Sequence, residues 1–209
     1  LTQLFQIGLE SEAYEAHRIL GEVATGGGRV LALAPSMQAL MLMVARAEMY
    51  CDQPEAASQY LARVTKPDYV APDPLDRNFL VAMVCAADLA CLQNDATAAT
   101  VISQRLDAYV GWHAVAAFGT TYLGPVTYWL GRLSLCCNRT EDAQRHLHLA
   151  REHSDSAGSV IYRAWSDYYL AQALPAKQSA RREALLKHAQ NAARDFSLGR
   201  LQSALGRSH

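Results

Sequence analysis

The chain has 209 residues, which is long enough to bury a substantial core, and the first expectation is one domain or one continuous array. Its 19 Lys and Arg nearly balance 20 Asp and Glu, and no block of like charge occurs, which argues against a dedicated nucleic-acid surface. Hydrophobic residues make up 51%, with only 12 Gly and 7 Pro, and this composition excludes disorder and favours packed helices over sheets.

Apolar residues recur at intervals of three and four through almost the whole chain, in segments separated by Gly, Pro, Asn and Asp. This pattern predicts about ten helices and no strand. In chain order, helices are expected over residues 9–25, 35–51, 53–65, 74–93, 95–110, 122–137, 140–155, 159–173 and 178–197, with a short tail helix after Gly199. The Gly- and Pro-rich segments "TGGGR", "TKPDYVAPDP" and "GWHAVAAFGTT" are predicted to be loops between helix pairs.

Five segments repeat one local pattern, in which a turn and an acidic residue precede an alanine that opens an amphipathic helix. These alanines are Ala13, Ala56, Ala99, Ala143 and Ala184, with spacings of 43, 43, 44 and 41 residues. A near-constant period is the signature of stacked helical hairpins, which bury their apolar faces only against their neighbours. The sequence therefore predicts an all-α solenoid of about five repeats, forming a single domain over residues 1–209.

The fourth repeat carries a resemblance to a known family. Leu130 and Gly131 precede Ala143 by thirteen and twelve residues, and Leu147 and Ala150 follow it by four and seven, a spacing that resembles the tetratricopeptide repeat. The resemblance implies a right-handed superhelix of antiparallel helix pairs, in which a residue without a side chain lets two helices approach. The chain departs from the pattern in lacking the helix-ending proline and in its period of about 43 rather than 34, so HEAT-type repeats of 40 to 47 residues remain an alternative.

A longer segment, "LGPVTYWLGRLSLCCNRTEDAQRHLHLAREHSDSAGSVIYRAWSDYYLAQAL", is similar to the C-terminal repeat region of bacterial signalling proteins. Those proteins join an ATPase module to a nucleotide cyclase or to a LuxR-type (MalT-like) DNA-binding domain. The present chain has no Walker lysine loop, no recognisable cyclase metal motif and no helix-turn-helix region after Leu201. The resemblance therefore implies a repeat module without an enzyme or DNA reader of its own.

The chain is expected to be cytoplasmic. The five cysteines are odd in number and lie inside apolar helical patterns, which indicates reduced, buried thiols. Residues 108–131 contain no charged side chain, but four glycines, Pro125, His113 and several threonines interrupt them, and no membrane span is predicted. No signal peptide opens the chain and Leu1 is not an initiator methionine, so a fragment of a larger multidomain protein is expected.

No metal, cofactor or catalytic set is predicted. His146 and His148 lie two apart on one helix and point to different faces, whereas His153, seven residues from His146, shares its face, and the three are interpreted as solvated. Cys136 and Cys137 are adjacent, with Arg132 and Arg139 about a turn away as groups that lower the thiol pKa. No catalytic partner accompanies them, and burial at a helix end is the preferred interpretation.

Tyrosines and tryptophans gather in the fourth hairpin and the segment after it, where they form either the core between repeats or a groove. In tetratricopeptide repeats the first helix of each hairpin lines the concave surface. By this resemblance the groove-facing positions are Met41, Ala45, Glu48, Val84, Asp88, Tyr128, Arg132 and Tyr169. Arg132 beside Tyr128 is expected to hold a carboxylate or a peptide segment through a charge-assisted hydrogen bond next to a flat apolar face.

The sequence is consistent with three functions. The first is a non-enzymatic module that mediates protein-protein or interdomain contacts in a bacterial signalling or transcriptional regulator, with a protein or peptide partner and no direct contact with nucleic acid or membrane. The alternative is a small-molecule sensor whose pocket lies between Trp112 and Trp129. An enzyme that uses His113 or His153 is the third.

Overall fold

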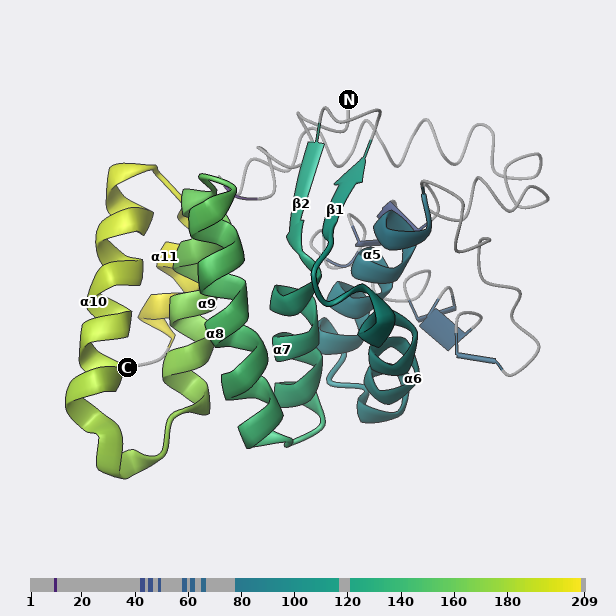
Figure 1. Cartoon of the computed structure of the whole chain (residues 1–209), viewed down its shortest axis with the longest axis horizontal. Coiled ribbons are helices and arrows are strands. Elements are labelled where there is room, and N and C mark those ends of the chain that lie inside the picture. Colours follow the sequence, from purple (N-terminus) through teal and green to yellow (C-terminus); the bar gives the residue numbers. More distant parts are fainter. Residues whose placement is uncertain are drawn as a thin grey trace.

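A computed structural model of the chain describes residues 78–116 and 121–207, together with positions 10, 42, 43, 45, 46, 49, 58, 59, 61, 62, 65 and 66. The described part is mostly helical (Figure 1). Its α-helices are α5 (Phe79–Leu92), α6 (Ala96–Leu106), α7 (Val126–Cys136), α8 (Thr140–Ser156), α9 (Val160–Ala173), α10 (Ser179–Asp195) and α11 (Gly199–Gly206). None of these helices combines the length and the apolar character needed to span a membrane.

The helices predicted after residue 74 are confirmed, with shifted ends. The helix expected over 95–110 ends at Leu106 and continues as the 3-10 turn η2 (Asp107–Tyr109), and α10 is preceded by the 3-10 turn η4 (Ala176–Gln178). The helix expected over 122–137 begins only at Val126. Of the helices expected over 9–25, 35–51 and 53–65, only separate positions belong to the described residues.

The prediction that the chain has no strand is wrong. Strand β1 (His113–Ala116) pairs antiparallel with β2 (Thr121–Pro125), with Val115 opposite Tyr122 and Ala116 opposite Thr121. β1 lies inside the segment "GWHAVAAFGTT" that was expected to be a loop. Alternate residues Ala114 and Ala116 are buried while Val115 is exposed, and this period of two is the strand pattern. Because the buried residues are small alanines, the alternation of buried and exposed residues in β1 does not stand out in the sequence.

Polar turns set the helix ends in the described part. Asn94 and Asn138 end α5 and α7 with φ angles of 53° and 56°, a left-handed conformation that Asn tolerates better than most residues. Asp95 then accepts a hydrogen bond from the Ala98 backbone N–H at 2.9 Å and caps α6, and Ser159 does the same for α9 at 3.5 Å. These left-handed asparagines and side-chain caps are therefore the local cause of the repeated pattern in which a turn precedes a helix.

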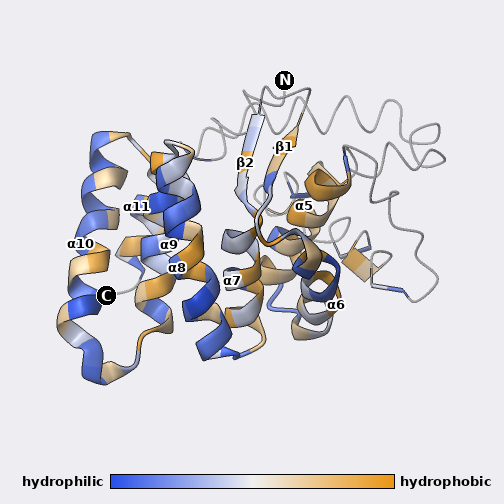
Figure 2. Cartoon of the chain, viewed as in Figure 1, coloured by the Kyte–Doolittle hydropathy of each residue, from blue (hydrophilic) through white to orange (hydrophobic). Residues whose placement is uncertain are grey.

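Successive helices pack on one another in a row. α7 packs on α8, α8 on α9 and α9 on α10, while α5 and α9 both contact α7 (Figure 1). Figure 2 shows α5 as predominantly hydrophobic, whereas α8 and α10 carry alternating hydrophilic and hydrophobic residues. The burial of the side chains agrees with this pattern. Most residues of α5 are buried from solvent, whereas α10 buries only Leu185, Ala189, Ala192 and Ala193. The core therefore lies along α5, α7 and α9.

Small residues permit the close contact between α7 and α8. A Cβ atom placed on Gly131 would lie 2.5 Å from Cγ of Leu147, a distance that real Cβ atoms do not adopt. Ala143, Leu147 and Ala150 are fully buried. The equivalent of Ala143 one repeat later, Ala184, is exposed on α10, so the packing expected of the fifth repeat is absent.

Candidate functional site

Four of the eight residues predicted to face a groove, Asp88, Tyr128, Arg132 and Tyr169, lie among the packed helices. Asp88 of α5 and Tyr128 of α7 are 0% exposed, Arg132 of α7 is 6% exposed, and Tyr169 of α9 is half-buried. Met41 and Glu48 lie outside the described residues. Two further positions named for the groove, Ala45 and Val84, are also buried. These positions, on the first helices of successive pairs, therefore lie close together. For Asp88, Tyr128 and Arg132, however, the meeting point is in the interior.

Asp88 is the centre of a buried ion network. Arg132 Nη1 donates to its Oδ1 and Arg46 Nε donates to its Oδ2, both at 2.5 Å. Burial by itself would raise the pKa of Asp88, but Arg132 and Arg46 outweigh burial and hold that pKa well below its usual range. The carboxylate that Arg132 was expected to receive from a ligand is thus supplied by Asp88.

Aromatic rings surround this network. The Arg132 guanidinium lies over the rings of Tyr169 and Trp129, with centroid distances of 5.0 and 5.3 Å. Trp129 donates its indole N–H to the Leu123 carbonyl at 2.8 Å, and its ring is an edge-to-face neighbour of Tyr128. Five of the clustered aromatic residues are buried, namely Tyr128, Trp129, Tyr162, Trp165 and Tyr168. For these five the core interpretation holds, because they fill the space between neighbouring helices.

Two buried hydroxyl groups in this cluster have no hydrogen-bond partner among the residues that the structure describes. They belong to Tyr128 and Tyr162, whose ring centroids are 5.2 Å apart. Burial raises the pKa of both phenols well above the ordinary value, so both remain neutral donors. An unpaired buried hydroxyl costs free energy, and in a native protein it calls for a partner such as water or a ligand.

A second buried carboxylate lies between α8, α9 and α10. Asp167 of α9 is 0% exposed and has Arg151 Nε at 2.7 Å, His188 Nδ1 at 2.5 Å and Arg163 Nε at 3.7 Å. These contacts are close ion pairs without the alignment of hydrogen bonds. Arg163 also donates to Asp155 Oδ2 at 3.0 Å. Side chains of three helices, α8, α9 and α10, are thereby brought together at one carboxylate.

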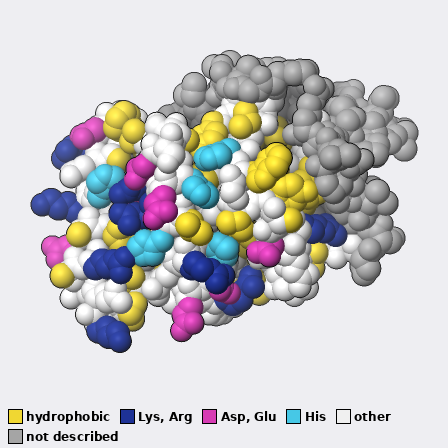
Figure 3. Space-filling view, in the orientation of Figure 1, with side chains coloured by type: hydrophobic (Ala, Val, Ile, Leu, Met, Phe, Trp, Pro, Cys, Tyr) yellow, Lys and Arg dark blue, Asp and Glu magenta, His cyan; other side chains and the backbone are white. Residues whose placement is uncertain are grey.

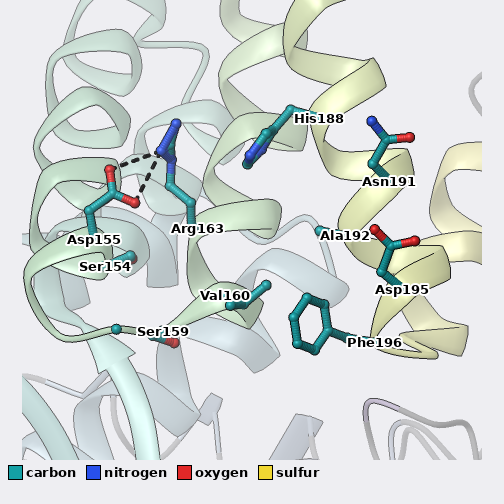
Figure 4. Close-up of a pocket in the computed structure, with 11 residues that line it drawn as sticks. Ser154, Asp155, Ser159, Val160, Arg163, His188, Asn191, Ala192, Asp195 and Phe196 are labelled. Atoms are coloured by element: carbon teal, nitrogen blue, oxygen red, sulfur yellow. Dashed lines mark hydrogen bonds and ion pairs between the residues drawn. The ribbon is translucent and has the colours of Figure 1, made fainter.

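A cavity of about 480 Å³ opens beside Asp167, and it is the candidate functional site (Figure 4). The last turn of α8, the first turns of α9 and the second half of α10 form its walls. Figure 4 shows Arg163 and His188 pointing toward one another from α9 and α10, whereas Val160 and Phe196 lie together at the other end. Val160 is 38% and Phe196 is 58% exposed. The cavity therefore has one polar end and one unburied apolar end.

Sequence reasoning missed this cavity. None of its residues was singled out for it, and its walls come from three separate helices that are joined by contacts such as that of Asp167 with His188. The one available signal was Phe196, a large apolar residue in the polar run "NAARDFS" at a helix end.

The histidines are arranged differently from the prediction. His146 and His148 do point to different surroundings, because His148 Nε2 accepts from Arg181 at 2.7 Å while His146 is buried at 8% exposure. The interpretation of His146 as solvated is therefore wrong. Burial, and then Arg145, lowers its pKa. His153 does not pair with His146 but lies next to His113 of β1, with ring centroids 5.9 Å apart.

The described cysteines are free thiols. Cys85 is buried, and Cys91, Cys136 and Cys137 are half-buried. Arg132 does lower the pKa of Cys136, but burial and then Cys137 raise it more, so the pKa of this thiol is above its ordinary value. Cys51 lies outside the described residues. Within the described ranges, no group of three His, Cys, Asp or Glu is placed to hold a metal ion.

No family model, curated protein or solved structure matches the chain.

Proposed function

We propose that the chain is a non-enzymatic helical-repeat module of the tetratricopeptide-like type, which binds a protein or peptide partner or sets contacts between domains of a bacterial signalling or transcriptional regulator. Contacts at a separation of one repeat support the repeat architecture. Arg46 contacts Asp88 at a separation of 42 residues, and Asp88 contacts Arg132 at 44. Met49 and Gln93 are also 44 residues apart and in contact. Equivalent positions of successive helix pairs thus face one another, as a solenoid requires.

The observation that carries the binding function is the cavity between α8, α9 and α10. Two consecutive helix pairs form its walls, and Phe196 and Val160 leave apolar surface open to solvent at its mouth. Burying an exposed Phe side chain on association contributes about 1.5 to 3 kcal/mol to binding. At the polar end of the cavity, Asn191 and His188 are available for hydrogen bonds that orient a partner. An extended peptide that places an apolar side chain against Phe196 fits both ends.

Photo-crosslinking tests this function. The whole chain, with benzoylphenylalanine in place of Phe196, is expected to crosslink one discrete protein in cells of the source organism. The matched control carries the same group at Gln190, an exposed position of α10 that does not line the cavity. Val160→Asp is expected to reduce the crosslink at least fivefold while the circular dichroism spectrum stays unchanged. Equal crosslinking from positions 190 and 196 would contradict a specific contact site at the cavity.

A small-molecule sensor is the second candidate, favoured by the unpaired hydroxyls of Tyr128 and Tyr162 beside Arg132. A ligand that accepts hydrogen bonds from both phenols would be enclosed by three neighbouring helices and would stabilise their packing. A pocket was expected between Trp112 and Trp129, but the two side chains lie in different environments. Trp112 is 61% exposed beside β1, whereas Trp129 is 1% exposed.

Tyr128→Phe separates the two functions. Without ligand, the variant is expected to be as stable as the wild type or about 1 kcal/mol more stable, because the deleted hydroxyl has no hydrogen-bond partner in the described part of the chain. Urea denaturation measures this. For the sensor, a panel of sugars, amino acids and nucleotides is expected to contain one compound that raises the melting temperature of the wild type and not of Tyr128→Phe. Tyr168→Phe is the matched control, since its hydroxyl already donates to the Ala204 carbonyl at 3.3 Å. Equal shifts in all three proteins would exclude the tyrosine site.

A further inference from the structure

His113 and His153 form a pair that the helix row and the hairpin build together. His113 is the first residue of β1 and His153 lies in the last turn of α8, 40 residues later. Both are half-buried, and their ring centroids are 5.9 Å apart at an interplanar angle of 50°. Because both side chains are only half-buried, the pair is accessible from solvent, and it is anchored on two separate elements. Figure 3 shows histidine side chains at the surface on the face that it displays.

Each imidazole has one nitrogen held by a hydroxyl group. His113 Nδ1 lies 2.7 Å from the Tyr122 hydroxyl on the paired strand, and His153 Nδ1 lies 3.2 Å from Thr127 Oγ1 at the start of α7. The Nε2 atoms of both rings have no hydrogen-bond partner among the residues that the structure describes. Histidines that bind metals typically use one ring nitrogen for the ion while a hydrogen bond orients the other. Tyr122 and Thr127 are in place to do this for both rings.

The ring separation fits a single ion. Imidazole binds divalent ions such as Zn²⁺ at about 2.0 to 2.1 Å, which puts each ring centroid about 3.2 Å from the ion and, at a tetrahedral angle, two ligating rings about 5.2 Å apart. The observed ring separation of 5.9 Å is close to this value.

The surroundings of the pair favour ions that prefer nitrogen ligands. Neither ring forms an ion pair with a carboxylate in the described part of the chain, and oxygen-preferring ions such as Mg²⁺ and Ca²⁺ have no ligand here. Neutral imidazole selects Zn²⁺, Ni²⁺ and Cu²⁺.

We propose that His113 and His153 bind one divalent transition-metal ion through their Nε2 atoms, with Tyr122 and Thr127 as positioning residues and water in the remaining coordination positions. No third protein ligand is placed to join them among the described residues, so the site keeps open positions for water or for a ligand from a partner. A bound ion links the β1–β2 hairpin to the end of α8, two elements already in contact.

Calorimetric titration of the whole chain with Ni²⁺ tests the proposal, in the presence of a non-coordinating buffer and a phosphine reductant that keeps the thiols reduced. One ion per chain is expected to bind, and His113→Gln and His153→Gln are each expected to weaken the affinity at least tenfold. Tyr122→Phe is expected to weaken it by less than His113→Gln. His148→Gln and His188→Gln, which alter half-buried and exposed histidines outside the pair, are the matched controls and are expected to leave the affinity unchanged.

Imidazole nitrogen NMR spectra of the wild type give a second measurement that does not depend on how stable the variants are. Saturating Zn²⁺ is expected to shift the Nε2 resonances of two histidines, which through-bond correlations to the backbone assign to His113 and His153. Affinity that survives both substitutions within twofold, or Zn²⁺-induced shifts confined to other histidines, would overturn the proposal. So would the absence of binding at millimolar ion.

Discussion

Replacing Asp88 with Asn is expected to lower the free energy of unfolding by about 3 to 5 kcal/mol, because it leaves two buried cations without their counter-charge. Asp88 is fully buried, and it binds Arg46 and Arg132 with one oxygen each. The Arg46 and Arg132 side chains are only 2% and 6% exposed, so water cannot replace the lost carboxylate. Urea denaturation followed by circular dichroism measures the change.

The control for Asp88→Asn is the same substitution at a surface pair. Asp142 lies 2.8 Å from Arg145, with side-chain exposures of 39% and 64%, and ion pairs of this kind contribute about 0 to 1 kcal/mol. Asp142→Asn is therefore expected to change stability by less than about 1 kcal/mol. A loss of similar size in both variants would mean that the Asp88 network is no more stabilising than a surface contact.

The same network predicts how stability depends on pH. Because Arg132 and Arg46 hold the folded-state pKa of Asp88 below that of the unfolded chain, the unfolded state takes up a proton first on acidification. The stabilising contribution is fully present above about pH 5 and falls as the pH drops through about 4 toward the folded-state pKa. Asp88→Asn is expected to flatten this part of the acid titration, and an unchanged slope below pH 4 would contradict it.

The three charged residues of this network show how far the sequence leads. Arg46, Asp88 and Arg132 are spaced by 42 and 44 residues, close to the period found from the alanines, and the resemblance to the tetratricopeptide repeat put Asp88 and Arg132 among the groove-facing positions. Their burial could not be predicted, because a charged residue on a repeat helix is assigned to a surface unless its partner is known. The partner of Asp88 is a full repeat away in each direction.

Local signals predicted helices well and long-range contacts poorly. α8 was expected over 140–155 and spans Thr140–Ser156, since Glu141 and Asp142 in its first turn and Gly158 after its end are strong boundary signals. In contrast, His153 was assigned to the His146 face by helical spacing. Its actual neighbour, His113, belongs to strand β1, which the sequence did not predict. When an element is not predicted, none of its contacts can be predicted either.

Replacing Gly124 with Ala is expected to lower the free energy of unfolding by about 2 to 4 kcal/mol, because two separate costs add at this position. Gly124 has a φ angle of +93°, where a side chain introduces backbone strain of about 1 to 3 kcal/mol. A Cβ atom there would also lie 2.5 Å from Cε1 of Tyr162, and overpacking costs about 1 to 3 kcal/mol. Thermal and urea denaturation measure the sum.

Gly158→Ala separates these two costs. Gly158 also has a positive φ, +65°, but a Cβ atom there has no neighbour within 4 Å, so this variant carries the backbone strain alone. The excess loss in Gly124→Ala is then the cost of displacing Tyr162, whose ring is held by Tyr122, Tyr128 and Trp129 at centroid distances of 5.4, 5.2 and 6.4 Å. Tyr162→Leu in the Gly124→Ala background is expected to recover part of that excess. Equal losses in the two glycine variants would show that the ring yields freely, and the aromatic cluster would then be softer than its close packing indicates.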